Sequence, residues 1–230
     1  MIKTKDDYTF YLEADRIALA KTNSPSSSIS SQFKEHFFKD EIWKFQKALR
    51  KLEFLKNKKK NVFEKVNYFF AYRHYQKLSY KLGFTIPPNV FGPGLSIAHY
   101  GSITINPKSR IGCNCRIHSG VNIGTEAGYA NKAPTIGDNV YIGPGAKVFG
   151  AISIANNTVI GANAVVNSSF NQEYTTIGGI PSKIISENIE IDNFLIRATK
   201  LIEIGMNKND ISNLTAREIK KLIDSNHEKH

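Results

Sequence analysis

The sequence has little cysteine, no long apolar run and few acidic residues, and each of these shortages excludes some classes of protein. Only two cysteines occur among 230 residues, Cys113 and Cys115. A framework of structural disulfides is therefore not expected, and free thiols fit a reducing compartment. No stretch approaches the roughly 20 apolar residues that a membrane-spanning helix needs. The first residues contain acids where a secretory signal would have its apolar core, so we expect a cytoplasmic protein.

The shortage of acids leaves a net charge of +11, and this excess lies mainly at the front of the chain. Residues 1–85 hold 18 Lys and Arg against 9 Asp and Glu, and residues 56–60 read KNKKK. Such a run is typical of a solvated helix end, and it also suits an anionic glycan or a membrane surface as partner. Nucleic acid is not expected, because no recognised binding motif accompanies the charge.

The first 85 residues are predicted to form a helical domain. Apolar residues recur at helical spacing over residues 6–21. They recur again every three or four positions from Ile42 to Leu55, which places them on one face of a second helix. A third helix is expected to end at Gly83, because glycine suits the position after a helix C-terminus. The N-terminal domain is thus expected to span residues 1–85.

The middle of the chain carries a repeat of six residues. Aliphatic residues recur at this spacing from Ile111 to Ile123, and again without a miss from Ile136 to Val166. A period of six is neither helical nor that of a simple strand, and it indicates a repeat architecture. We predict a left-handed parallel β-helix over residues 86–185. Each hexapeptide is then one side of a triangular coil, with its aliphatic residue pointing inward.

Two segments fall outside the repeat. Ile136 follows Ile123 by thirteen positions, seven more than the repeat needs, so the chain is expected to leave the coil there as a loop. In solenoids such loops are often binding sites. Beyond the repeat, residues 190–205 and 215–225 are expected to form short helices in a C-terminal tail, residues 186–230. The expected fold class is α+β: a helical domain, a β-helix and a short helical tail.

Several runs of the repeat resemble a known family. HYGSITINPKSRIGCNCRIHSGVNIG, PTIGDNVYIGPGAKVFGAISIANNTVIGANAVV and the closing GGIPSK together resemble the serine acetyltransferase branch of the hexapeptide-repeat acyltransferases, over roughly residues 80–185. The resemblance implies an O-acetyltransferase that uses acetyl-CoA, and a homotrimer with active sites between neighbouring β-helices. It leaves open whether two trimers pair through the helical domain. KLGFTIPPNVFGPGLSIAHYG also resembles relatives associated with surface-polysaccharide biosynthesis, such as that of capsules.

The resemblance also implies roles for residues of this chain. His99 matches the general base of the family. Lys183 matches the basic residue near the phosphate end of the coenzyme. The IGPGAK and IGANAV segments match stretches that hold the pantetheine arm through backbone groups. The residues expected to bind the coenzyme are Gly143, Pro144, Gly145, Ala146, Lys147, Gly161, Ala162 and Lys183.

The residues themselves agree with His99 as a base. An imidazole near its ordinary pKa removes a proton from an alcohol at neutral pH, and the thioester is already activated, so no acylated side chain is needed. His99 and His118 are the two histidines in the repeat, and His118 is expected to point outward because it follows an inward isoleucine. The residues expected to contact the acceptor are His118, Tyr100, Glu126, Tyr129, Asn131 and Lys132.

The sequence departs from serine acetyltransferases in ways that bear on the acceptor. Their loop histidine is replaced by Ala133, the acid before the catalytic histidine by Ala98, and no acid stands at Phe84-Thr85. We therefore expect a sugar of a surface polysaccharide as acceptor, with L-serine as the alternative. A non-catalytic trimeric scaffold is a further alternative. A zinc hydratase needs three histidines where the repeat has two, so no metal is expected.

Overall fold

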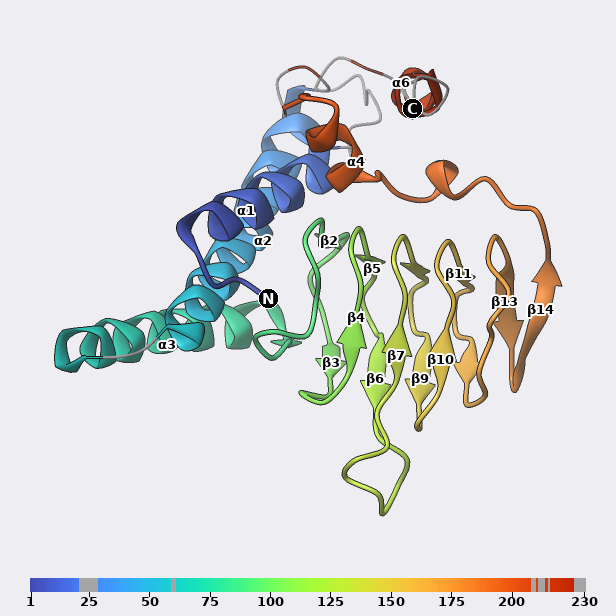
Figure 1. Cartoon of the computed structure of the whole chain (residues 1–230), viewed down its shortest axis with the longest axis horizontal. Coiled ribbons are helices and arrows are strands. Elements are labelled where there is room, and N and C mark those ends of the chain that lie inside the picture. Colours follow the sequence, from blue (N-terminus) through green and yellow to red (C-terminus); the bar gives the residue numbers. More distant parts are fainter. Residues whose placement is uncertain (21–28, 59–60, 208–209, 211–213, 215, 226–230) are drawn as a thin grey trace.

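The computed structural model describes residues 1–20, 29–58, 61–207, 210, 214 and 216–225. Its helices are α1 (Lys5–Ala20), α2 (Ile29–Asn57), α3 (Val62–Leu82), the 3-10 helix η1 (Ile191–Asn193), α4 (Ala198–Glu203) and α6 (Ala216–Ser225). Its strands are β1 (Phe84–Thr85), β2 (Ser96–Ile97), β3 (Ile103–Ile105), β4 (Arg110–Ile111), β5 (Arg116–Ile117), β6 (Asn122–Gly124), β7 (Thr135–Ile136), β8 (Tyr141–Ile142), β9 (Lys147–Phe149), β10 (Ser153–Ile154), β11 (Val159–Ile160), β12 (Val165–Val166), β13 (Thr176–Gly179) and β14 (Ser182–Ser186). This order confirms the expected fold class, with helices first, a β-helix next and short helices last (Figure 1).

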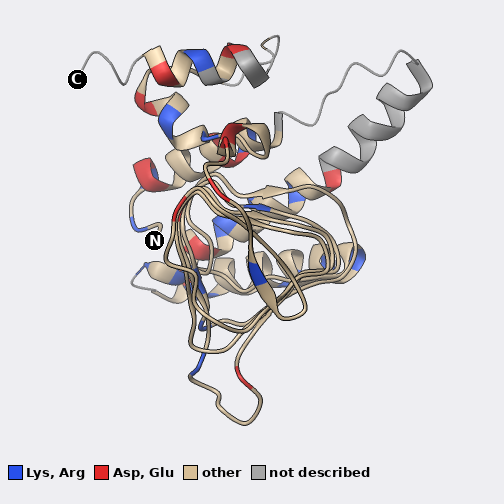
Figure 2. Ribbon diagram, turned by 90° about the vertical axis from the view of Figure 1, so that its right-hand side faces the viewer, with Lys and Arg blue, Asp and Glu red and all other residues tan. Residues whose placement is uncertain are grey.

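Three parallel sheets form the sides of the β-helix. Sheet A contains β1, β3, β6, β9 and β12, sheet B contains β4, β7 and β10, and sheet C contains β2, β5, β8, β11 and β13. The antiparallel strand β14 closes the far end of sheet C. From β1 to β13 consecutive strands belong to different sheets, so each of these strands pairs with the equivalent strand of a neighbouring coil. Seen along the axis, the coils superimpose into one closed outline (Figure 2).

The six-residue period is explained by stacked inward side chains. In sheet C the register aligns one isoleucine from each coil, and all of them are at most 1% exposed: Ile97, Ile117, Ile142, Ile160 and Ile177. Burying such a side chain contributes about 1.5–3 kcal/mol, so a column of them stabilises the coils along their whole length. The predicted inward orientation of the aliphatic residues is therefore confirmed.

Asparagines stack along the edge between sheets B and C. Asn114, Asn139 and Asn157 have φ angles of 55°, 56° and 55°, a left-handed conformation that asparagine tolerates better than most residues. The Asn114 side-chain amide donates to Asn139 (2.8 Å), and that of Asn139 donates to Asn157 (2.9 Å). The Asn157 amide donates to Glu173 (3.0 Å), which ends the ladder. Each coil is thus tied to the next by a side-chain hydrogen bond at this edge.

The N-terminal helices close the first coil. Gln46 of α2 donates to the carbonyl of Leu95 over 2.7 Å, just before β2. Helix α3 begins at a capping box between Asn61 and Glu64 and ends, as predicted, at Gly83, whose φ is 76°. Strand β1 follows directly and joins sheet A, so α3 is continuous with the solenoid. None of the described helices combines the length and the apolar character that crossing a bilayer requires.

The C-terminal segment runs back along the β-helix. After β14 the chain returns over sheet C to α4, which lies beside α1 (Figure 1). We call residues 187–197 the strap. Ile191 and Leu195 of the strap are buried against Val159 of sheet C. The expected helix over residues 190–205 is therefore wrong in extent, because the strap must stay largely extended to span the coils, and only η1 and α4 are helical.

Candidate active site

The turns between sheets C and A bring many of the expected site residues to one edge of the β-helix. His99 and His118 follow β2 and β5, which are neighbours in sheet C. Gly143 and Gly161 follow β8 and β11, the next two strands of the same sheet. Because each strand lies directly beside its neighbour, the four turns form one column. We call this column the C–A edge.

Two histidines lie against each other at the start of this column. The ring centroids of His99 and His118 are 5.7 Å apart, at an angle of 54°. His118 is partly buried, and its Nε2 atom is shielded from solvent without a hydrogen-bond partner among the described residues. Burial, reinforced by the nearby charges of Arg116 and His99, lowers the pKa of His118 to about 4. His118 is therefore neutral at pH 7 and adds no charge of its own beside His99.

The glycines of the column are required by the close stacking of the turns. Gly145 has a φ of +75°, and a Cβ there would lie 2.0 Å from the Asn163 side-chain oxygen. The Gly145 N–H donates to the Ser119 carbonyl over 2.9 Å, and the Gly120 N–H donates to Ser102 over 2.7 Å. These N–H groups are committed to the fold, so they are not free to bind an oxyanion. The Lys147 ammonium also donates to this column, at the carbonyl of Gly120.

The residues expected to bind the coenzyme spread along the same edge. Pro144 and Ala162 are exposed on neighbouring turns, whereas Ala146 is completely buried and presents no side chain to a ligand. Lys183 lies on β14, opposite Gly178 of β13, and it is exposed. The edge therefore offers exposed small residues in the middle and a lysine at the far end. This order suits an elongated ligand with a negatively charged end.

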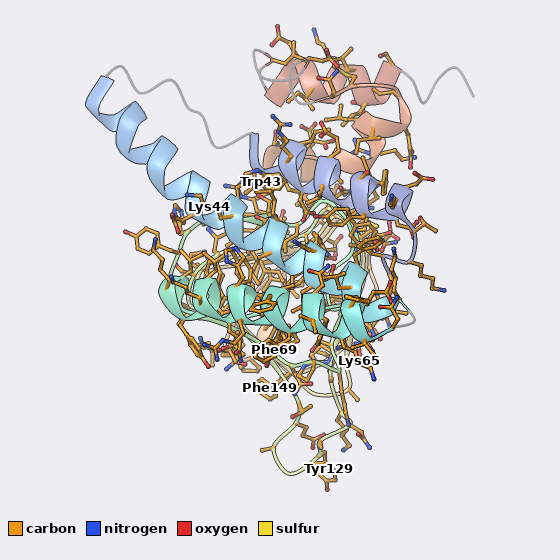
Figure 3. The ribbon with its side chains drawn as sticks, turned by 90° about the vertical axis from the view of Figure 1, so that its left-hand side faces the viewer. Trp43, Lys44, Lys65, Phe69, Tyr129 and Phe149 are labelled. Carbon is orange, nitrogen blue, oxygen red and sulfur yellow. The ribbon has the colours of Figure 1, made fainter. Side chains whose placement is uncertain are left out.

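The loop residues lie at a different edge from His99. The segment between β6 and β7 leaves the coil where sheet A passes to sheet B, and Tyr129 at its tip points away from the coils (Figures 1 and 3). Lys132 pairs with Glu126 over 2.8 Å and covers the Tyr129 ring at 3.9 Å, while Asn131 accepts from Lys108. Within one chain the loop and the two histidines are thus not brought together. Of the other expected acceptor contacts, Tyr100 is exposed beside His99.

Three further residues reach this site without having been predicted. Arg116 and Tyr141 face outward from sheet C beside His118, and the His118 and Tyr141 rings are 5.0 Å apart. Tyr141 in turn contacts Phe194 of the strap, with centroids 5.5 Å apart. Arg116 and Tyr141 each precede an inward isoleucine, so the repeat itself marks them as outward neighbours. No local signal identifies Phe194, because the strap lies outside the repeat.

The described residues contain no group of three His, Cys, Asp or Glu side chains arranged to hold a metal ion. The titratable groups of the C–A edge are imidazoles, a phenol and basic side chains. Such a set can bind anionic groups and exchange protons with a neutral acceptor.

Comparisons with known proteins agree with this architecture. Residues 133–168 match the family model described as bacterial transferase hexapeptide (six repeats). A serine acetyltransferase of Staphylococcus xylosus is 38% identical over 129 residues, which are 55% of this chain and 59% of that protein. A serine acetyltransferase of Staphylococcus aureus strain N315 is 41% identical over 108 residues, 46% of this chain and 50% of that protein. The chain thus matches only half to three fifths of the length of these relatives.

Solved structures share the fold over a longer stretch. The serine acetyltransferase of Brucella abortus strain S19 in complex with coenzyme A has a TM-score of 0.60 and 23% identity, covering 79% of this chain and 69% of that one. The soybean serine acetyltransferase complexed with serine has a TM-score of 0.61 and 22% identity, covering 78% and 70%. In sequence this chain is therefore similar to serine acetyltransferases over about half its length, and it carries a bacterial transferase hexapeptide segment within its β-helix.

Proposed function

We propose that this protein is an acetyl-CoA-dependent O-acetyltransferase of the serine acetyltransferase type, with its active site at the C–A edge. The observation that carries the proposal is the placement of His99 and the neutral His118 at the start of the column that also holds the glycine turns and ends at Lys183. A single edge then carries a base, a path for an elongated donor and a cation for its phosphates.

The proposed chemistry follows from the imidazole of His99. Acetyl-CoA supplies an activated thioester. His99 takes the proton from the acceptor hydroxyl as its oxygen attacks the thioester carbonyl, and then returns a proton to the departing sulfur. His118 lines the acceptor position as a neutral group, so it does not disfavour the positive charge that His99 gains. General base catalysis of this kind contributes about 10²–10⁴-fold to the rate.

The comparisons favour L-serine as acceptor over the sugar that we expected from the sequence. The relatives with 38–41% identity are named serine acetyltransferases, and structural neighbours from soybean and Neisseria gonorrhoeae are described as complexes with serine. A link to polysaccharide biosynthesis has no support among these proteins. A saccharide stays as second candidate for one reason: Ala98, Ala133 and Thr85 leave the site without the acids and the loop histidine that the resemblance leads one to expect.

We also propose that the enzyme works as a homotrimer. The loop that carries Tyr129 and Lys132 lies at a different edge from His99 within one chain, so these residues meet the site only if a neighbouring copy supplies them. Packing of β-helices side by side around a three-fold axis places the edge of one copy against the sheet of the next. The acceptor would then lie between His99 of one copy and the loop of its neighbour.

The proposal is tested by following thiol release from acetyl-CoA with purified protein. L-serine is offered in one series, and monosaccharides or capsule oligosaccharides in another. We expect serine-dependent release that falls at least about 100-fold in His99→Ala, since the base is lost. His74→Ala is the matched control, because His74 is an exposed histidine of α3 and not of the C–A edge. Release with a glycan alone would replace serine as acceptor, and equal rates for His99→Ala and His74→Ala would refute the assigned base.

A further inference from the structure

Four rings form a continuous row from the C-terminal strap to the candidate base. Phe194 of the strap contacts Tyr141 at 5.5 Å, Tyr141 contacts His118 at 5.0 Å, and His118 contacts His99 at 5.7 Å between centroids. All three contacts are tilted, at 59°, 56° and 54°, an arrangement that aromatic pairs favour over face-to-face stacking. We call these four residues the ring row.

The ring row takes the place of a hydrogen bond at His118. A functional imidazole is usually oriented by a hydrogen bond from its second nitrogen. The Nε2 atom of His118 is buried without such a partner among the described residues. The orientation of the His118 ring therefore depends on packing, with the Tyr141 ring as its neighbour, and the exposed His99 ring rests against His118.

The strap holds the outer end of the row in place. Phe194 lies between buried Ile191 and Leu195, which pack on Val159 of sheet C. Further along, the Thr199 N–H donates to the Asn114 side chain over 3.1 Å, and the Asn114 amide donates back to the Thr199 hydroxyl over 2.8 Å. These contacts fix the strap to the β-helix on both sides of the row, so Phe194 has little freedom to move.

We infer that Phe194 and Tyr141 are positioning residues for His118 and, through it, for the base His99. The strap thereby acts on the candidate site through the ring row. The kinetic consequence of this inference rests on the proposed function, whereas the positioning of the rings does not depend on it. Misplacing a catalytic group by about 1 Å can cost up to 10²-fold in rate, so even a small rotation of His99 is measurable.

The test replaces Phe194 by residues that separate ring contact from apolar burial. Phe194→Leu keeps an apolar contact between the strap and sheet C and removes the ring, and we expect kcat to fall about tenfold while the KM for acetyl-CoA stays within about twofold. Phe194→Tyr restores a ring and should recover kcat. Phe170→Leu is the matched control, because Phe170 is also partly buried against the core but pairs with Ile154 at sheet B, away from the row.

A second readout does not depend on turnover. In protein with labelled histidines, the ring resonances of His99 and His118 should shift in Phe194→Leu and stay in place in Phe170→Leu. Unchanged resonances together with unchanged kcat in Phe194→Leu would overturn the inference. If the resonances shift but no acceptor supports thiol release even in the unaltered protein, the proposed function falls while the positioning of the two rings by the strap stands.

Discussion

Arg50 and Asp15 form a fully buried, two-pronged ion pair that joins the N-terminal helices to the first coil. The Nε and Nη2 atoms of Arg50 lie 2.8 Å and 3.1 Å from the two oxygens of Asp15, and both side chains are 0% exposed. Asp15 also accepts from the N–H groups of Gly94 and Leu95, and Arg50 donates to the carbonyl of Gly92. Both partners of the pair are therefore also hydrogen-bonded to the backbone of the first coil.

Removing one partner of this pair should be costly. Asp15→Ala leaves the Arg50 charge buried, with Glu53 as its one remaining carboxylate partner among the described residues, and we expect the free energy of unfolding to fall by about 3–5 kcal/mol. Burial lowers the pKa of Arg50, but Asp15 and Glu53 outweigh this effect and hold the pKa above its ordinary value. Arg50 therefore stays protonated and charged. Urea unfolding measures the change. In the exposed pair Lys200–Glu203, Glu203→Ala should cost less than about 1 kcal/mol, and similar losses in both variants would contradict the assignment.

His118 should make the protein less stable in mild acid. Its pKa is lowered from 6.5 to about 4 in the folded state. Between these two pH values His118 is protonated in the unfolded chain and neutral in the folded chain. Stability is then lost as the pH falls from about 6.5 toward 4, by about 2 kcal/mol between pH 7 and pH 5. His118→Gln removes this titration. Unfolding by urea at both pH values should show a smaller loss for the variant, and equal losses would show that other groups dominate.

The asparagine ladder allows hydrogen bonding and backbone conformation to be separated. Asn139→Gly keeps the left-handed conformation and loses the side-chain bonds to Asn114 and Asn157, at a cost of about 1–3 kcal/mol. Asn139→Ala loses the same bonds and also places a Cβ at a positive φ, which adds about 1–2 kcal/mol. Thermal or urea unfolding should therefore rank the three proteins in that order. An alanine variant as stable as the glycine variant would mean that the turn relaxes out of the left-handed region.

Helix α3 carries an exposed apolar surface, and we expect it to be the contact between two trimers if trimers pair. In its first turns Val62, Phe63, Val66, Phe69 and Phe70 are all more than half exposed. Figure 3 labels Phe69 and Lys65 on this helix. An exposed apolar cluster of this kind is typical of an interaction surface. We expect the double variant Phe63→Ser/Phe70→Ser to lower the molar mass measured by light scattering to that of a trimer.

The control for this measurement is Tyr80→Ser, since Tyr80 is an exposed aromatic residue at the other end of α3, outside the cluster. It should leave the pairing of trimers intact. If the unaltered protein already has the mass of a trimer, the apolar surface of α3 does not pair trimers. If the double variant keeps a larger mass, the contact lies elsewhere.

The fold was predictable from the sequence to the extent that local repetition determines it. The period of six identifies the inward residues, because each coil buries the same position against the coil before it, as Ile117 and Ile142 show. Gly83 could be assigned as a helix end from its own backbone preference. These features depend on residues that are near in sequence or that recur at a fixed interval.

The rest depends on contacts between distant segments, which no local pattern encodes. Asn114 bonds to Thr199 across 85 positions, and Phe194 meets Tyr141 only because the strap runs back over sheet C. For the site, the repeat singled out His99 and His118 as its two histidines, and the structure shows that they lie on neighbouring coils. The repeat did not predict that the loop would emerge at a different edge from His99. The count of residues shows where a coil is interrupted, but it does not show which residues the inserted loop contacts.

The returning strap couples the number of coils to the length of a single segment. Neighbouring strands of a sheet are about 4.8 Å apart, so adding or deleting one 18-residue coil changes the span between β14 and α4 by that distance. An extended residue covers about 3.3–3.6 Å. A duplication of one coil therefore has to be matched by one or two extra residues in the strap, or Phe194 would slide along the coils away from Tyr141. An open solenoid can change its coil number freely during evolution, whereas here such a change must be compensated far along the chain.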